Sequence, residues 1–197
     1  MPVARDIVYG ADARHRLMAG IDRLADTVAV TLGPRGRNVL IEHRTSGFAP
    51  LATRDGATVV RSLTLGDKVG NIGVALIRQV VNTVSREVGD GTSTTVLLTR
   101  CLARAAGKGM AAGMSPRDIR AGMDMAGRAV TSDLTRQARD CAGHKALAHI
   151  AALAAHDEAA IGALISKAIE TAGTDGTIVI ELGAGLTDEI ERVEGMR

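Results

Sequence analysis

The sequence predicts a mainly α-helical protein of the α+β class: a multi-helix domain with short strands, followed by a smaller α/β unit. Apolar residues recur at helical spacing over four long stretches before residue 137. Short β-branched runs stand between glycine-containing turns. A polar segment with a glycine at 137–143 then separates these stretches from two shorter helical ones.

Composition indicates a folded protein with an aliphatic core. Hydrophobic residues make up 46% of the 197 residues, whereas Tyr9 and Phe48 are the only aromatic ones and there is no tryptophan. A nucleic-acid platform built on base stacking is therefore disfavoured. The net charge of +2 comes from 24 basic and 22 acidic residues without a block of one sign, so a DNA-binding arm is also disfavoured.

Nothing in the sequence indicates a membrane or secreted protein. No apolar run approaches the length of a membrane span. Met1–Asp6 carries charges where a signal peptide would be apolar, so we expect a cytoplasmic protein. Cys101 and Cys141 lack metal-ligand spacing and are expected to be free thiols rather than a disulfide or metal pair.

The first elements alternate between helix and short strands. Residues 4–9 alternate loosely and suggest a short strand, and a helix is predicted from 11 to 31, ending at Gly33-Pro34. Strands are predicted at 38–42 and 51–53. The apolar stripe of the helix consists of Leu17, Ile21, Leu24, Val28 and Leu32.

The chain turns helical again after Asp55-Gly56. A broad apolar stripe from Val69 to Val88 predicts a helix largely enclosed by others. A third long helix is expected from 92 to 106, and a fourth after Ser115-Pro116, an N-cap with proline at the first helical position. Its apolar positions are Ile119, Met123, Ala126, Val130 and Leu134.

The remaining residues predict a second unit. Helices are expected at 145–155 and 158–172, and strands at 177–181 and 188–193. We therefore place a domain boundary between residues 138 and 139.

Three glycine-containing turns carry the possible chemistry: 31–38 (TLGPRGRN), 53–56 (TRDG) and 89–95 (GDGTSTT). The third turn opens a helix, whose free N–H groups and partial positive charge attract a phosphate. Gly91 would let the phosphate approach. Asp90 would repel a bare phosphate, so its presence suggests Mg²⁺ between the two.

Each turn alone has an ordinary structural explanation. GDGT is also a helix stop followed by an N-cap, TLGP is a common helix C-terminus, and Arg54-Asp55 could be a surface ion pair. The sequence holds no GxxxxGK[ST] loop, which disfavours a P-loop kinase or GTPase.

Together, in this order and at these separations, the turns resemble the nucleotide site of group I (GroEL-type) chaperonins. The resemblance extends to 12–34 (DARHRLMAGIDRLADTVAVTLGP), 110–124 (MAAGMSPRDIRAGMD) and 188–196 (DEIERVEGM), and so to essentially the whole chain. It implies an equatorial-type ATP-binding domain at 1–138, the first half of an intermediate-type domain at 139–197, and no apical domain.

The resemblance also implies roles for particular residues. ATP and Mg²⁺ would be the cofactors, with Asp90 as the magnesium ligand and Asp55 as an acidic residue that assists hydrolysis. Two of the site residues depart from the family: Ser93 replaces a threonine, and Arg54 replaces a lysine, which changes the geometry of phosphate binding or has no effect. The nucleotide-binding residues would be Thr31, Leu32, Gly33, Pro34, Arg54, Asp90, Gly91, Thr92, Ser93 and Thr94.

The family's main water-activating aspartate and its client-binding groove have no counterpart in the sequence. We therefore expect slow or no ATP hydrolysis, and an exposed apolar patch on the Val69–Val88 helix. The expected partners are other chaperonin subunits; unfolded clients and a co-chaperonin would need regions supplied by another chain. The alternatives are a non-enzymatic chaperonin-like interaction protein and an unrelated small nucleotide-binding domain.

Overall fold

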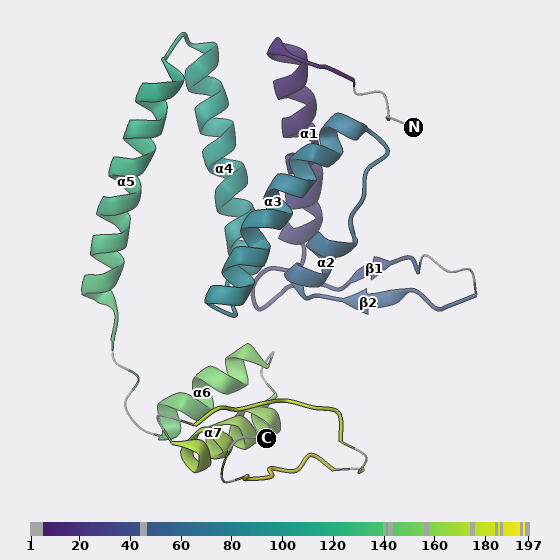
Figure 1. The fold of residues 1–197 in the computed structure, drawn as a ribbon, viewed down its shortest axis with the longest axis vertical. Coiled ribbons are helices and arrows are strands. Elements are labelled where there is room, and N and C mark those ends of the chain that lie inside the picture. The colour runs from purple at the N-terminus through teal and green to yellow at the C-terminus, as the bar shows by residue number, and fades with distance from the viewer. Residues whose placement is uncertain are drawn as a thin grey trace. The chain divides into compact units, whose positions relative to one another are not determined.

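The computed structural model describes residues 6–43, 47–139, 141, 144–155, 158–173, 176–183, 185, 187–193 and 195. Within these residues the chain forms seven helices and two short strands, which confirms the mainly helical prediction (Figure 1). It divides into two compact units, Met1–Arg128 and Ala129–Arg197. This division runs through one helix, so the domain boundary after residue 138 stays a prediction.

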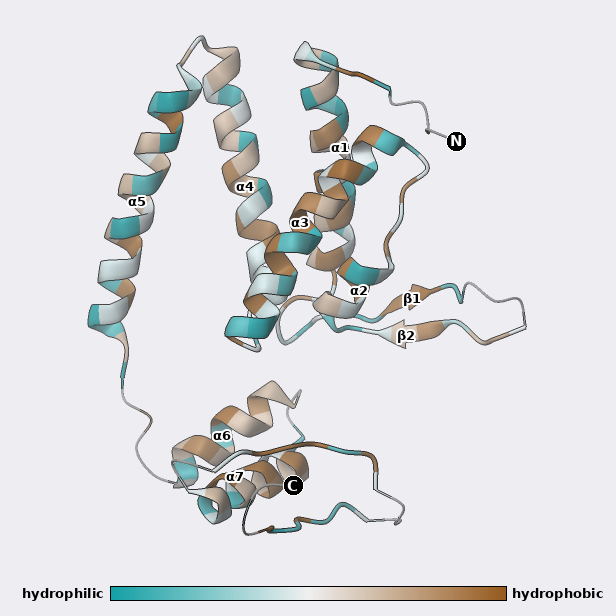
Figure 2. Cartoon of the chain, in the orientation of Figure 1, coloured by the Kyte–Doolittle hydropathy of each residue, from teal (hydrophilic) through white to brown (hydrophobic). Residues whose placement is uncertain are grey.

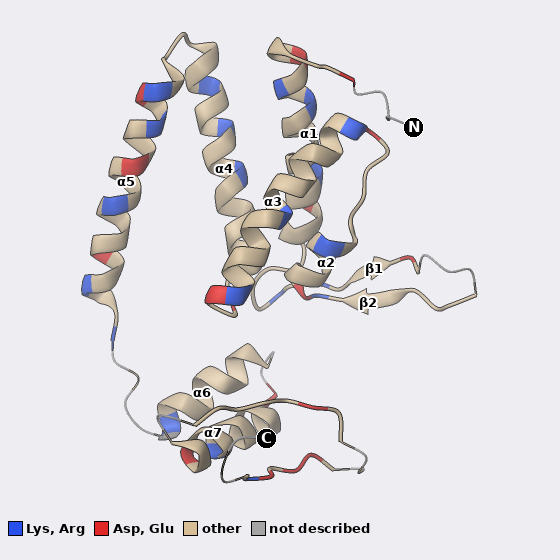
Figure 3. Cartoon of the chain, viewed as in Figure 1, with Lys and Arg blue, Asp and Glu red and all other residues tan. Residues whose placement is uncertain are grey.

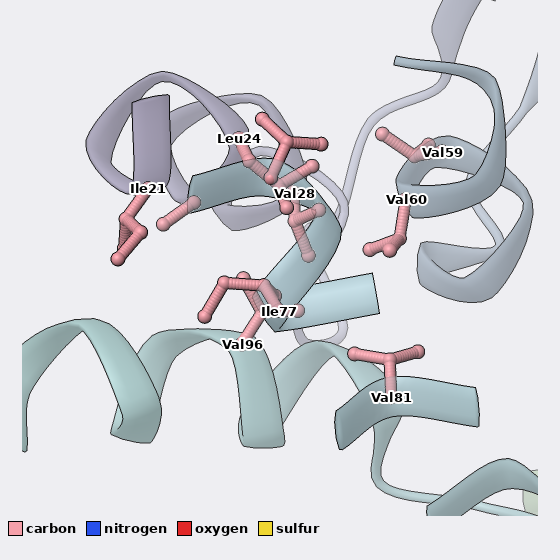
Figure 4. Packing of buried hydrophobic residues seen from close by; sticks show 10 residues of the cluster. Ile21, Leu24, Val28, Val59, Val60, Ile77, Val81 and Val96 are labelled. Carbon is pink, nitrogen blue, oxygen red and sulfur yellow. The ribbon is translucent and has the colours of Figure 1, made fainter. Parts of the chain in front are cut away.

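The first unit is built around three long helices, α1 (Gly10–Ala29), α3 (Lys68–Glu87) and α4 (Thr92–Ala111), and the short helix α2 (Gly56–Ser62). Each of the four helices contributes to one aliphatic core, as the sequence predicts (Figure 4). Full burial of a side chain of this kind contributes roughly 1.5–3 kcal/mol to stability. The core consists of Ile21, Leu24, Ala25, Val28, Val59, Val60, Val74, Ile77, Val81 and Val96.

Helices α1 and α3 approach each other through glycines. A Cβ on Gly20 would lie 2.0 Å from the carbonyl oxygen of Gly70, and one on Gly73 would lie 2.4 Å from that of Leu17. The two backbones are therefore in direct contact at this crossing, which only residues without a Cβ permit. Near the crossing, Asp67 caps α3 by accepting from Gly70 N at 2.7 Å and pairs with Arg16 of α1.

The strands form a two-stranded antiparallel sheet. Strands β1 (Val39–Ile41) and β2 (Leu51–Thr53) pair Val39 with Thr53 and Ile41 with Leu51. Both lie within the predicted ranges. Helix α2 follows β2 almost at once and ends at Ser62, before the separate helix α3 begins.

An arginine ties α2 to α3. Arg78 of α3 donates to the carbonyl oxygen of Leu63 at 2.8 Å and to that of Val60 at 3.3 Å. These carbonyls belong to the C-terminal end of α2, where the helix dipole favours a positive charge. Arg78 therefore fixes the end of a helix that is too short to be stable alone.

Charged side chains link α1 to α4. Arg104 pairs with Asp22 at 2.8 Å, and Arg100 pairs with Asp26 one turn further along. Figure 3 marks the lysines and arginines of α4 in blue. Helix α5 (Pro116–Gln137) begins where the sequence predicts, but none of its residues is buried.

The second unit contains α6 (His144–Ala154) and α7 (Ala159–Ala172), both predicted and both rich in apolar residues (Figure 2). They pack through small residues: a Cβ on Gly162 would lie 2.7 Å from Ala152. The close approach places Gly162 and Ser166 of α7 among the buried residues.

The strand predictions outside β1 and β2 are wrong where the structure describes the residues. The described residues of 177–181 and 188–193 form no strand. A strand needs a neighbour to accept and donate its ladder hydrogen bonds, and neither segment has one in the described part of the chain. Residues 6–9 likewise form no strand, and the rest of that predicted strand lies outside the described residues.

No helix in the described ranges is both long and apolar enough to cross a membrane.

Candidate functional site

The ladder between β1 and β2 joins the first two turns of the predicted site. Because Val39 pairs with Thr53, the turn before β1 ends beside the point where the chain leaves β2. Asn38, which precedes β1, and Arg54, which follows β2, therefore lie at the same end of the ladder. Arg54 is half-buried there.

The first turn is closed by its own backbone. Gly36 N donates to the carbonyl oxygen of Gly33 at 2.9 Å, and Arg37 N donates to that of Val30 at 2.8 Å. Gly33 has a φ of +82°, which an L side chain rarely adopts. Thr31 is buried, and its hydroxyl donates to the carbonyl oxygen of Val28 at 2.8 Å. This closed loop holds two apolar side chains, Leu32 and Pro34, at the protein surface.

The second turn places Asp55 at the N-cap of α2. Its Oδ2 accepts from Thr58 N at 2.8 Å and from Thr58 Oγ1 at 2.5 Å, and its Oδ1 accepts from Ala57 N at 3.3 Å. Partial burial opposes ionisation of Asp55, but these hydrogen bonds, with the charge of Arg61, lower its pKa below the ordinary value. Asp55 is therefore an ionised carboxylate at neutral pH and a weak base.

The third turn leaves a helix N-terminus open. Gly89 and Gly91 have φ values of +82° and +80°, and Gly91 is the N-cap of α4. Gly91 has no side chain to cap the helix, so the first N–H groups of α4 have no capping side chain in the described part of the chain. Asp90 is exposed, and its Oδ1 accepts from Gly91 N at 2.6 Å.

The second and third turns are in contact. A Cβ on Gly56 would lie 2.0 Å from Ser93 Oγ, 3.2 Å from its Cβ and 3.5 Å from its Cα. Gly56 is the first residue of α2 and Ser93 lies in the first turn of α4. The structure therefore brings the N-termini of α2 and α4 together, with Asp55 at their junction.

The first turn is connected to the third through the core. Val28 precedes the first turn by one helical turn, and Val96 follows the N-terminus of α4; both belong to the same buried cluster (Figure 4). The turns therefore extend from one packed body within the first unit, although they are far apart in sequence.

The place where the N-termini of α2 and α4 meet is suited to binding an anion together with its counterion. A helix N-terminus with free N–H groups attracts a phosphate. Mg²⁺ in such sites commonly takes one or two carboxylates, the remaining ligands being waters and phosphate oxygens. No cluster of three or more metal-ligating side chains occurs among the described residues, so a metal would rely on Asp90 and on ligand oxygens. The donor set fits a magnesium ion that arrives with a phosphate.

The predicted residues do not line the open cavity of about 340 Å³ beside α2 and α3. Arg61, Asn82, Ser85 and Arg86 line that cavity.

Sequence reasoning missed two residues of this junction, Gly56 as a packing contact and Thr58 as a partner of Asp55. The spacing of Asp55 and Thr58 carries a signal, because a side chain three residues after an N-cap can reach back to it. The contact of Gly56 with Ser93 has no local signal.

The chain is similar in sequence to a known protein family and to a curated relative. Residues 24–196 match the model of the TCP-1/cpn60 chaperonin family. Over 194 residues the chain is 41% identical to "Chaperonin GroEL 2" of Cereibacter sphaeroides, which covers 98% of this chain and 35% of that protein. The chain thus spans about a third of the length of this curated relative.

Solved structures of chaperonins are also similar to this chain. The chaperonin gp146 from the bacteriophage EL 2 (Pseudomonas aeruginosa), crystallised in the presence of ATP-BeFx, matches with a TM-score of 0.68 and 26% identity over 81% of this chain and 28% of that chain. A group III chaperonin in the open state also gives a TM-score of 0.68, at 22% identity, over 81% of this chain and 32% of that one. The second match shows the fold alone.

Proposed function

Because this chain belongs to the TCP-1/cpn60 chaperonin family, we propose that it binds ATP with Mg²⁺ at the junction of α2 and α4. The binding would serve a protein-folding machine of the GroEL type. The relative of 41% identity and the phage chaperonin crystallised with ATP-BeFx support this proposal.

The observation that carries the proposal is the contact between Gly56 and Ser93. It brings the start of α2, which Asp55 caps, to a helix N-terminus whose N–H groups have no side-chain cap. A negative side chain beside an anion site is costly unless a cation accompanies the anion. The acidic side chain and the open helix N-terminus together therefore favour a phosphate that carries Mg²⁺ over a bare anion.

In this proposal the turn at α4 binds the phosphates. The N–H groups at the helix N-terminus and the hydroxyls of Thr92 and Thr94 donate to phosphate oxygens, and Gly91 permits their approach. Ser93 contributes its N–H, because its hydroxyl lies against Gly56. Asp90 would hold Mg²⁺, which would neutralise negative charge on the phosphates.

The other turns position the nucleotide and water. Thr31, Leu32, Gly33 and Pro34 form a closed surface against which the nucleotide packs, and Arg54 adds positive charge for a phosphate. Asp55 accepts a hydrogen bond from the attacking water and so orients it.

We propose that this chain alone hydrolyses ATP slowly. A general base works best when its pKa lies near the operating pH, whereas that of Asp55 is lowered by its hydrogen bonds. Asp55 can orient water but is poor at removing its proton. The partners of this function are other chaperonin subunits in the cytoplasm, and unfolded proteins and a co-chaperonin where other regions supply the surfaces.

Calorimetric titration with Mg-ATP tests the proposal. Wild-type chain should bind saturably, Asp90→Ala should lose most of the affinity, and Asp118→Ala should bind like wild type. Asp118 is a matched control because it is an exposed aspartate in the first turn of another helix, α5. Equal binding by Asp90→Ala and wild type would contradict the assignment of Asp90.

A second candidate function, a non-enzymatic interaction protein, is favoured by exposed apolar side chains on α3. Ile72, Leu76 and Val80 recur every four residues, and their exposed fractions are 55%, 52% and 40%. If this second candidate function is correct, the folded chain should bind a hydrophobic dye but no Mg-ATP. Saturable binding of Mg-ATP that Asp90→Ala abolishes would favour the first candidate.

A further inference from the structure

Asp55 is held by more hydrogen bonds than a helix cap requires. An N-cap carboxylate needs only to accept from the backbone N–H groups of the first turn. Asp55 does so through Ala57 N and Thr58 N, but it also accepts the hydroxyl of Thr58. Its own N–H donates to Thr53 Oγ1 at 3.1 Å, so its backbone is fixed as well.

The hydroxyl of Thr58 is used differently from those of other helical threonines. Thr27 donates to the carbonyl oxygen of Arg23 at 2.9 Å, and Thr95 donates to that of Gly91 at 2.8 Å. Such bonds to the preceding turn are the usual local option for a threonine in a helix. Thr58 instead turns its hydroxyl to a carboxylate at the start of its own helix.

The two oxygens of Asp55 are unequally occupied as a result. A carboxylate oxygen has two lone pairs. Oδ2 accepts two short bonds, at 2.5 and 2.8 Å, whereas Oδ1 accepts one long bond, at 3.3 Å. Oδ1 therefore retains the capacity to accept another hydrogen bond.

From this geometry we infer that Thr58 is a positioning residue, which saturates Oδ2 of Asp55 and leaves Oδ1 as the oxygen that faces water or ligand. The inference rests on the proposed function, because it names the residue that orients the carboxylate of that site. Thr58 acts on the site only through Asp55 in this inference. Arg61, whose positive charge also acts on Asp55, is separate from this contact.

Three variants test the inference in the full chain without nucleotide. Thr58→Val keeps the shape of the side chain and removes the hydroxyl, Thr58→Ser restores a hydroxyl, and Thr27→Val removes a hydroxyl that donates to a backbone carbonyl. The readouts are three-bond NMR couplings to the Asp55 carboxyl carbon, which report its χ1 rotamer, and NMR titration of the same carbon.

We expect Thr58→Val to give averaged couplings and an Asp55 pKa that rises toward the ordinary aspartate value. Thr58→Ser and Thr27→Val should keep the fixed rotamer and the lowered pKa. Unchanged couplings and pKa in Thr58→Val would overturn the inference, as would an equal change in Thr58→Ser. Circular dichroism of each variant confirms that it is folded, and Thr58→Ala, which also lacks the hydroxyl, takes the place of Thr58→Val if that variant does not fold.

These readouts do not depend on nucleotide binding. If wild-type chain fails to bind Mg-ATP while the couplings change as expected, the proposed function fails and the hydrogen-bond geometry stands. If wild type binds Mg-ATP and the couplings do not change, only the role of Thr58 fails.

Discussion

Gly56 and Ser93 lie in contact where the N-termini of α2 and α4 meet, so close that a Cβ on Gly56 would stand 2.0 Å from Ser93 Oγ. The residues are separated in sequence by the whole of α3. Their contact brings the N-cap of α2, Asp55, close to the N-terminus of α4, which has no side-chain cap.

Replacing Gly56 with alanine should destabilise the first unit. The added methyl group overlaps Ser93, and overpacking of this kind costs about 1–3 kcal/mol. Urea unfolding followed by circular dichroism measures the change in the free energy of unfolding. Gly107→Ala is the control, because open space surrounds that glycine in α4, and it should stabilise the protein by roughly 0.5–1 kcal/mol.

Ser93→Ala should partly rescue Gly56→Ala. Removing Oγ takes away the 2.0 Å contact and leaves the Ser93 Cβ at 3.2 Å, which a small shift can relieve. The double variant should therefore be more stable than the sum of the two single changes predicts. Additive effects in a double-mutant cycle would mean that the two positions do not touch.

Gly20→Ala should be more damaging than Gly56→Ala. The new Cβ meets the backbone carbonyl of Gly70 at 2.0 Å, and backbone cannot rotate away as a serine hydroxyl can. We expect a loss at or above the upper end of the range of about 1–3 kcal/mol. Thermal unfolding checks this result against Gly122→Ala, whose Cβ would meet nothing within 4 Å.

Asp55 should make the stability of the first unit depend on pH. Its pKa is lower in the folded protein than the value of about 3.9 in an unfolded chain, so the carboxylate stabilises the folded state above that value. The contribution is lost as the pH falls through the folded pKa. Asp55→Ala should cost about 0.5–2 kcal/mol at neutral pH through loss of the cap.

Asp55→Asn separates capping from charge. Asparagine caps helices well but does not titrate in this range, so its cost at neutral pH should be smaller than that of alanine. The difference in the free energy of unfolding between wild type and Asp55→Asn should narrow below about pH 4. A constant difference across a pH series of urea titrations would show that the carboxylate does not have a lowered pKa.

Arg78→Met should loosen the end of α2. The substitution keeps much of the apolar stem but removes the donors to Leu63 O and Val60 O, and loss of hydrogen bonds from a charged group costs about 1.5–3 kcal/mol. Hydrogen exchange of the amides in α2 should accelerate. Arg100→Met, which breaks an ion pair with the exposed Asp26, should change that exchange little.

The sequence predicted the long helices well because each signal is local. The apolar stripe with Ile21, Leu24 and Val28 repeats within α1, and Ser115-Pro116 marks the start of α5 wherever the rest of the chain lies. The pairing of β1 with β2 was equally accessible, because only one loop separates them.

The predictions that failed depend on neighbouring segments in the fold, which the local sequence does not specify. Residues 177–181 are β-branched enough to form a strand, but a strand also needs a neighbour, and none is present among the described residues. The close approach of Gly56 to Ser93 arises from how α2 and α4 pack on a common core. The sequence therefore predicted the turns of the proposed site, whereas the contact between two of these turns became visible only in the packed structure.

The glycine crossing of α1 and α3 has a genetic consequence. Every missense mutation of a glycine codon adds a Cβ, so at positions 20 and 73 each such mutation places a carbon within 2.4 Å of a backbone oxygen. Neither position has a conservative substitute. Under selection for a folded protein, both should stay glycine while the exposed surface of α5 diverges freely.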